Sequence, residues 1–314
     1  MSDHAHREGD DRTRRAGEAQ APAGALPAGA LPARALAPAK INLGLFVGPT
    51  RADGKHELVS VMQSISLADE LTLEHAPDPA GGDQVLCPGV EGPSEQNLAA
   101  RALAAFRRAT GWQAPALRLT IRKRIPVAAG LGGGSADAAA ALRLAAYASG
   151  VGDLDLLRKL GAELGADVPA QIAPGRWLAT GAGEILAELP PPNPSFAVLV
   201  LPVDGALSTA AVYAQADRLG PLRDPRFLKE SARQLHAALD LGNQAPPPQL
   251  MVNDLEPAAR ALCHAIGPAL QQARDGGADL AFLSGSGPTV IGLFLRANGL
   301  VRAEIGRASC RERV

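Results

Sequence analysis

The chain has 314 residues, of which 46% are hydrophobic and 20% are charged, so it can form one large domain or two ordinary ones. Its formal net charge of -1 and its aromatic content of 3% argue against a nucleic-acid-binding protein, which usually presents a basic surface with stacking residues. The compact basic run Arg122–Arg124 is interpreted as a solvated strand end.

The three cysteines, Cys87, Cys263 and Cys310, form no C-x-x-C pair, and no histidine lies at zinc-binding spacing from them. We therefore expect free thiols and a reducing, cytoplasmic location. No apolar stretch reaches the roughly 20 residues that a membrane-spanning helix needs. Asp137 and Arg143 interrupt the longest alanine-rich segment, so we expect no membrane association.

The two ends of the chain differ from the rest. Residues 1–20 are charged and irregular, and recurring prolines in residues 21–38 argue against a helix, so we expect a disordered leader over residues 1–35. Its pattern fits neither a secretory signal nor a transit peptide. Residues 304–314 are polar and arginine-rich, without apolar periodicity, and we expect a non-native tail. An ordinary frayed tail is the alternative.

The first half of the chain begins with β-like patterns. Apolar or alternating runs predict strands at Ile41–Val47 and Leu58–Leu73, separated by the turn-rich segment Pro49–His56. Apolar residues at helical spacing then predict a helix over Asn97–Thr110. Strict alternation over Leu117–Arg122 indicates a half-buried strand that leads into a glycine cluster.

Helices follow the glycine cluster. Residues Ala136–Tyr147 form an alanine-rich helix pattern, and Leu154–Leu164 forms a second one. A turn is expected at Gly165–Pro169. The proline-rich segment Pro190–Pro194 then marks a boundary between the two halves, which we expect to be domains of residues 36–190 and 191–303.

The second half mixes strand and helix patterns. A continuous apolar run predicts a strand at Phe196–Leu201, and helices are expected at Pro225–Leu241 and Glu256–Arg274. Residues Ala281–Leu295 have the pattern of two strands joined by a turn. The combination predicts an α+β fold.

The strongest local signal for function is a glycine-rich run at the strand-to-helix junction. It reads Pro126-Val127-Ala128-Ala129-Gly130-Leu131-Gly132-Gly133-Gly134-Ser135-Ala136. Its glycines let the backbone approach a bulky anion, and unpaired N–H groups at the start of a helix favour phosphate. The Walker spacing is absent, and the Rossmann pattern fails because Ser135 takes its last glycine position. We expect a polyphosphate site, and a tight structural turn is the alternative.

Two charged residues would complete a phosphoryl-transfer site. Asp167 precedes Val168-Pro169, where the proline holds the preceding residue extended, and its carboxylate could accept the proton of a substrate hydroxyl. Lys40 begins the first predicted strand and could neutralise the transferring group and keep Asp167 ionised. Plainer roles are open for each, a surface lysine and a turn former. Spacing alone does not join them.

Six motifs resemble, in order, the signatures of the GHMP kinases. They are Pro38–Leu43, Arg51–Leu58, the loop Pro126–Ala136, Gly165–Pro169, Asn253–Glu256 and Leu283–Thr289, within a resemblance that covers about Leu36–Ala297. The glycine loop and the Ser-Gly-Ser-Gly turn are shared by the whole superfamily. The P-A-K-I-N, R-x-D-G-x-H and G-A-D-V-P motifs point to members that phosphorylate the 2-hydroxyl of 4-diphosphocytidyl-2-C-methyl-D-erythritol in non-mevalonate isoprenoid biosynthesis.

The resemblance implies a two-domain α+β fold, with a ribosomal-protein-S5-like N-terminal domain, a ferredoxin-like C-terminal domain and the active site between them. It implies ATP and Mg²⁺ as cofactors and a cytidine-diphosphate-linked methylerythritol as substrate. Lys40 and Asp167 are then the catalytic pair, and Asn42 lies near the substrate. His56 and Tyr213 are placed against the cytosine, and Ser284–Gly287 closes the site.

The chain departs from the family pattern in three ways. Lys55 stands where the family usually has tyrosine, which puts one wall of the cytosine site in doubt. Ala128 and Ala129 replace frequent glycines. The family also continues past the last strand with a helix and a strand, so we expect a truncated second domain. Two other functions stay open, namely a GHMP kinase for homoserine or mevalonate and a non-catalytic nucleotide-binding module.

Overall fold

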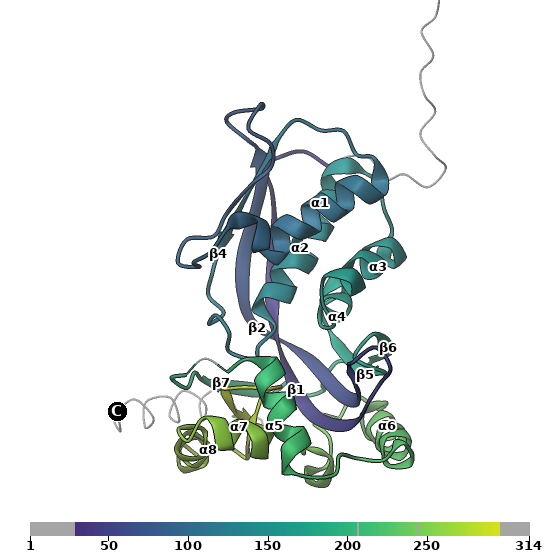
Figure 1. Ribbon diagram of the computed structural model, residues 1–314, viewed down its shortest axis with the longest axis vertical. Helices are drawn as coiled ribbons and strands as arrows, with labels where there is room; N and C mark the ends of the chain where they lie inside the picture. Colours follow the sequence, from purple (N-terminus) through teal and green to yellow (C-terminus); the bar gives the residue numbers. More distant parts are fainter. Residues whose placement is uncertain (1–28, 206, 244, 296–314) are drawn as a thin grey trace, which may run out of the picture.

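The computed structural model describes residues 29–295 except 206 and 244, and Figure 1 shows their arrangement. The larger of two sheets has six strands in the order β3-β4-β2-β5-β6, with β1 paired to β2, and the smaller has three in the order β7-β9-β8. The predicted α+β class is confirmed. The strands are β1 Ala33–Thr50, β2 His56–His75, β3 Gln84–Leu86, β4 Leu117–Arg122, β5 Arg176–Thr180, β6 Ile185–Leu189, β7 Ala197–Leu201, β8 Leu280–Leu283 and β9 Val290–Phe294.

Helices cover the sheets. Those of the first half are η1 Ser94–Gln96, α1 Leu98–Thr110, α2 Gly133–Ser149, α3 Leu154–Leu164 and α4 Val168–Ile172. Those of the second half are α5 Thr209–Leu219, α6 Pro225–Leu239, η2 Pro248–Leu250, α7 Glu256–Leu262 and α8 Ile266–Asp275. Within the described part of the chain, no helix combines the length and the apolar character that a membrane span requires.

The antiparallel pair β1 and β2 is longer than the sequence predicts. Its register runs from Ala33 opposite Leu73 to Thr50 opposite His56. The prediction of a disordered leader over residues 1–35 is therefore wrong for residues 33–35, which are strand. Over residues 33–38, β1 pairs on one side only, with β2. Pro38 lies beside a shift in the register of this pair, where the N–H that proline lacks is not required.

Helices α1 and α2 pack together over the larger sheet, as Figure 1 shows. Leu103 and Phe106 of α1 are buried with Leu71 and Leu117 of the sheet in one hydrophobic core. The predicted helix at residues 97–110 is confirmed, and Asn97 caps it by accepting a 2.9 Å hydrogen bond from the backbone N–H of Ala99. Helix α2 begins three residues before its predicted start, inside the glycine-rich run.

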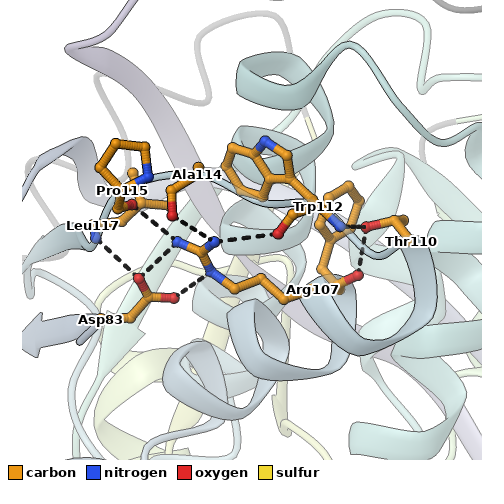
Figure 2. Close-up of polar contacts among 8 residues, drawn as sticks. Asp83, Arg107, Thr110, Trp112, Ala114, Pro115 and Leu117 are labelled. Carbon is orange, nitrogen blue, oxygen red and sulfur yellow. Dashed lines mark hydrogen bonds and ion pairs between the residues drawn. The ribbon is translucent and has the colours of Figure 1, made fainter. Parts of the chain in front are cut away.

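Arg107 fixes the connection between α1 and β4 (Figure 2). Its Nε and Nη2 donate to the two carboxylate oxygens of Asp83 at 2.7 and 2.8 Å. Further bonds of 3.2 to 3.3 Å go to the backbone oxygens of Trp112, Ala114 and Pro115. Asp83 also accepts from the backbone N–H of Leu117. The planar guanidinium thus holds the residue before β3 against the start of β4.

The second half differs from its prediction at one helix. Residues 256–274 form two helices, α7 and α8, with extended backbone at Cys263 between them. The single predicted helix is wrong because Pro268 would break a helix interior, whereas the first turn of α8 accepts it. Helix α5 was not predicted, although its buried residues Val212 and Ala216 lie at helical spacing.

The second half also contacts the larger sheet directly. Helix α6 packs against β1, β2 and β5. The segment before α7 runs beside β1, where the backbone of Leu45 bonds Val252 at 2.8 Å and Asp254 at 2.9 Å. The side of β1 that does not pair with β2 is therefore covered at Leu45 by residues from the second half of the chain.

Candidate active site

A cavity of about 1090 Å³ lies where the two halves meet. The first strand contributes Lys40 and Asn42, the glycine-rich loop contributes one wall, and the turn Gly285–Gly287 of the second half contributes another. The turn lies tightly against the loop, because a Cβ atom on Gly130 would lie 2.6 Å from the backbone oxygen of Ser284. The two shared superfamily motifs thus meet in one site.

The glycine-rich loop forms an open helix start. Gly132 is the N-cap of α2 in a left-handed conformation with φ 69°, and it has no side chain to satisfy the N–H groups that follow. Such N–H groups, with the positive end of the helix dipole behind them, are suited to bind an anion. All residues from Pro126 to Ser135 line the cavity. Ala136 does not, because it is buried in the core and supports the loop from below.

Ala128 is a strained position in this loop, with φ 56°. A left-handed conformation costs a residue with a side chain roughly 1 to 2 kcal/mol, and glycine avoids this cost. Glycine also loses more conformational entropy on folding, which offsets part of the stabilisation. Ala128→Gly is therefore expected to stabilise the protein by up to about 1 kcal/mol, a rise of about 2 °C in Tm. Thermal unfolding measures this. The neighbouring Ala129→Gly is the control, and an equal gain there would contradict the strain argument.

Lys40 and Asp167 come together across 127 positions of sequence. The Nζ atom of Lys40 lies 3.3 Å from Oδ2 of Asp167, with side chains 9% and 30% exposed. Asp167 is the N-cap of α4 and Val168 is helical, so the predicted extended conformation of the residue before Pro169 is wrong. Pro169 instead fixes the first helical turn. The pair has the composition of a base and a charge stabiliser for phosphoryl transfer.

Asn42 lies beside this pair. Its Oδ1 atom accepts a 2.7 Å hydrogen bond from Nζ of Lys40, and the residue is 5% exposed. Asn42 therefore contacts Lys40 as well as the cavity.

His56 and Tyr213 form one end of the cavity. Their ring centroids are 5.0 Å apart at an interplanar angle of 36°. Burial, and then the charge of Asp167, raises the pKa of Tyr213 to about 12, so its hydroxyl stays protonated. Lys55 is exposed at the rim of this end. The arrangement offers aromatic surface for a flat base.

Asp217 is a residue of this end that the sequence analysis missed. Its Oδ1 atom lies 2.9 Å from Nε2 of His56, and it lines the cavity. It follows Tyr213 by four residues in α5, so both lie on the same face of the helix. A helical interpretation of residues 209–219 would have found it.

The opposite end of the cavity holds a buried charge cluster. Nζ of Lys123 donates to Asp69 and, at 2.7 Å, to Oδ2 of Asp137. The prediction of a solvated basic run therefore fails for Lys123, although Arg122 and Arg124 have side chains 71% and 50% exposed. Burial lowers the pKa of Lys123, but the two carboxylates outweigh it and the pKa is raised.

Asp137 has an unusual pKa for a carboxyl group. Burial raises its pKa to about 7, although the charge of Lys123 opposes the shift. Asp69 also accepts hydrogen bonds from the backbone N–H groups of Arg124 and Ile125. Oδ1 of Asp137 is buried without a hydrogen-bond partner among the described residues. One ammonium thus stabilises two carboxyl groups unequally.

This pKa predicts how stability depends on pH. Between about pH 4 and 7 the folded state holds the Asp137 proton more tightly than the unfolded state, so stability falls as pH rises. Asparagine cannot ionise, so Asp137→Asn should remove this slope and gain most relative to wild type near pH 8. Tm measured from pH 4.5 to 8 tests this, with the exposed Asp155→Asn as control. Parallel curves for wild type and Asp137→Asn would contradict the raised pKa.

Comparisons with known families agree with the geometry. Residues 97–175 match the GHMP kinases N terminal domain, and residues 228–311 match the GHMP kinases C terminal domain. The second match includes residues 304–311 of the segment expected to be non-native. That expectation concerns residues outside the described ones and stays a prediction, as does the truncation of the second domain.

Individual relatives are similar over most of the chain. A 4-diphosphocytidyl-2-C-methyl-D-erythritol kinase of Thermobifida fusca is 42% identical over 261 residues, which are 80% of this chain and 83% of the relative. One of Anaeromyxobacter dehalogenans (strain 2CP-1) is 42% identical over 294 residues, 87% and 85% of the two chains. A crystal structure of 4-(cytidine 5'-diphospho)-2C-methyl-D-erythritol kinase has a TM-score of 0.68 and 34% identity, covering 88% of this chain and 96% of that one.

Proposed function

Because this chain belongs to the GHMP kinases, we propose that it transfers the γ-phosphoryl group of ATP to the 2-hydroxyl of 4-diphosphocytidyl-2-C-methyl-D-erythritol. The predicted two-domain GHMP kinase fold is confirmed. The observation that carries the catalytic proposal is the ion pair of Lys40 and Asp167 beside an open helix start. This reaction is a step of non-mevalonate isoprenoid biosynthesis.

Each wall of the cavity has a part in this reaction. The N–H groups at the start of α2 hold the phosphates of ATP, which brings the γ-phosphoryl group toward Lys40. Asp167 accepts the proton of the attacking hydroxyl, and Lys40 offsets the charge that develops on the phosphoryl oxygens. Catalysis then depends mainly on position and charge, as in other phosphoryl transfers.

The two ends of the cavity suit the two nucleosides. Cytosine stacks against the exposed side of the His56 and Tyr213 pair, whose ring centroids are only 5.0 Å apart, with Asn42 nearer the reacting hydroxyl. The adenosine of ATP then extends past the loop toward Lys123 and Asp137. Lys55 cannot stack on a base as tyrosine would, so Tyr213 carries most of the stacking at this end.

Magnesium ligands can be assigned only in part. No group of three histidine, cysteine, aspartate or glutamate side chains suited to a metal exists among the described residues. Mg²⁺ in kinases is commonly held by one or two protein oxygens together with phosphate oxygens. The hydroxyl of Ser135 lines the cavity beside the phosphate site and fits this role. The ion would neutralise phosphate charge.

The proposal is tested by ADP release from the purified protein. We expect turnover with 4-diphosphocytidyl-2-C-methyl-D-erythritol and little with homoserine or mevalonate. Turnover with either of those alcohols instead would favour another GHMP kinase activity. ATP binding without turnover on any of the three would favour a non-catalytic nucleotide-binding module.

The cellular setting is proposed from the cysteines. Cys87 and Cys263 are free thiols, and burial raises the pKa of Cys87. Cys310 lies outside the described residues. Free thiols are usual in a reducing compartment, which supports a cytoplasmic location.

A further inference from the structure

A buried chain of hydrogen bonds leads from the backbone of β1 to the ammonium of Lys40. The hydroxyl of Ser60 donates to the backbone oxygen of Gly44 at 2.7 Å. Nδ2 of Asn42 donates to Oγ of Ser60 at 2.7 Å, and Oδ1 of Asn42 accepts from Lys40 at 2.7 Å. Ser60 is fully buried at 0% exposure, and none of these atoms needs a water to complete the chain.

This chain of hydrogen bonds begins at an irregularity in the pairing of β1 with β2. Asn42 faces Met62 and Leu45 faces Ser60, so two residues of β1 oppose one of β2 between these pairs. Such a bulge frees a carbonyl from the ladder and redirects nearby side chains. The position of Gly44 is fixed, because a Cβ atom there would lie 2.6 Å from the backbone oxygen of Leu250.

The carbonyl sets the polarity of every bond that follows. A backbone oxygen can only accept, so the hydroxyl hydrogen of Ser60 points to Gly44 and its oxygen accepts from Asn42. The amide of Asn42 must then present its oxygen to Lys40. An asparagine turned the other way would place its NH₂ group against the ammonium, where two donors meet and no hydrogen bond forms.

On this basis we infer that Ser60 is a positioning residue for Lys40, acting through the amide of Asn42. Of the three N–H donors of Lys40, one is held by Asn42 and one lies toward Asp167, and the third has no partner among the described residues. Holding the first two directs the third into the cavity, where the transferring phosphoryl group passes. The inference rests on the proposed phosphoryl transfer and adds a residue that does not touch the phosphoryl group.

Removing the hydroxyl tests the inference. Ser60→Ala should lower kcat by about 10-fold, because small errors in the placement of a catalytic group are costly. KM for ATP and for 4-diphosphocytidyl-2-C-methyl-D-erythritol should stay within about twofold. Ser60→Thr keeps the hydroxyl and should restore most of kcat. The control is Ser64→Ala on the same strand, which removes a 3.1 Å bond to the backbone N–H of Gly175 but leaves the chain to Lys40 intact.

A second measurement separates positioning from general stability. In an Asn42→Ala background, Ser60→Ala should reduce kcat no further, because the link to Lys40 is already broken. An equal loss of kcat from Ser60→Ala in the Asn42→Ala background would overturn the inference. So would a Ser60→Ala single variant with unchanged kcat, or one in which KM rises and kcat does not fall. Wild-type protein without turnover would overturn the proposed function instead, so the two failures are distinguishable.

Discussion

Asp167→Asn is expected to lower kcat by roughly 10²-fold or more, the usual contribution of a general base. Asparagine keeps the size of the side chain and can still lie beside Lys40, but it cannot accept the proton of the attacking hydroxyl. The carboxylate is 30% exposed at the N-cap of α4, so the substitution should not disturb the core. KM for ATP should change little, because the phosphates bind the loop. Steady-state ADP release measures both constants.

The matched control for this variant is Asp155→Asn, an exposed aspartate in the first turn of α3. It removes the same charge outside the cavity, and its kcat should equal that of wild type. A near-normal kcat for Asp167→Asn would show that another group accepts the proton.

Lys40→Met is expected to reduce kcat by roughly 10²- to 10³-fold, because a charge aimed at the developing phosphoryl oxygens acts mainly in the transition state. Methionine retains the length and the apolar stem of lysine, which fills the buried position. Substrate KM values should move less than kcat. The same assay measures the loss, and the exposed Lys159→Met on α3 is the control.

The two catalytic variants should overlap in their effects. Residues that act as one unit lose their joint contribution once either is removed, so the double variant should be little worse than the poorer single one. A double loss much larger than the product of the single losses would contradict a shared catalytic unit.

The fold was predictable wherever the local pattern was strong. Alternation at residues 117–122 and helical spacing at residues 98–110 and 154–164 gave elements that the structure confirms. The start of β1 was not predictable from residues 33–38, because prolines argue against regular structure and only pairing along one side makes them acceptable there. The domain boundaries, expected at residue 190, stay a prediction.

The candidate site was predictable only where a motif carries it. The composition of the glycine loop indicates a phosphate site without further help. The pairing of Lys40 with Asp167 came from the family resemblance, and in the structure Nζ of Lys40 lies 3.3 Å from Oδ2 of Asp167. Ser60 and Asp217 carry no motif of their own, since a buried serine in a strand and an aspartate in a helix are ordinary residues. Their significance depends on tertiary contacts that connect Asn42 with Gly44 and His56 with α5.

The cover on the free side of β1 bears on how the molecule folds and on where it can be cut. The strand receives β2 on one side and the backbone of Val252 and Asp254 on the other. A fragment that stops before residue 252 would leave this stretch of strand bare, with unpaired N–H and C=O groups that invite edge-to-edge association. We therefore expect the two halves of the chain to depend on each other for solubility, and β1 to acquire its final partners only after the ribosome has released most of the second half.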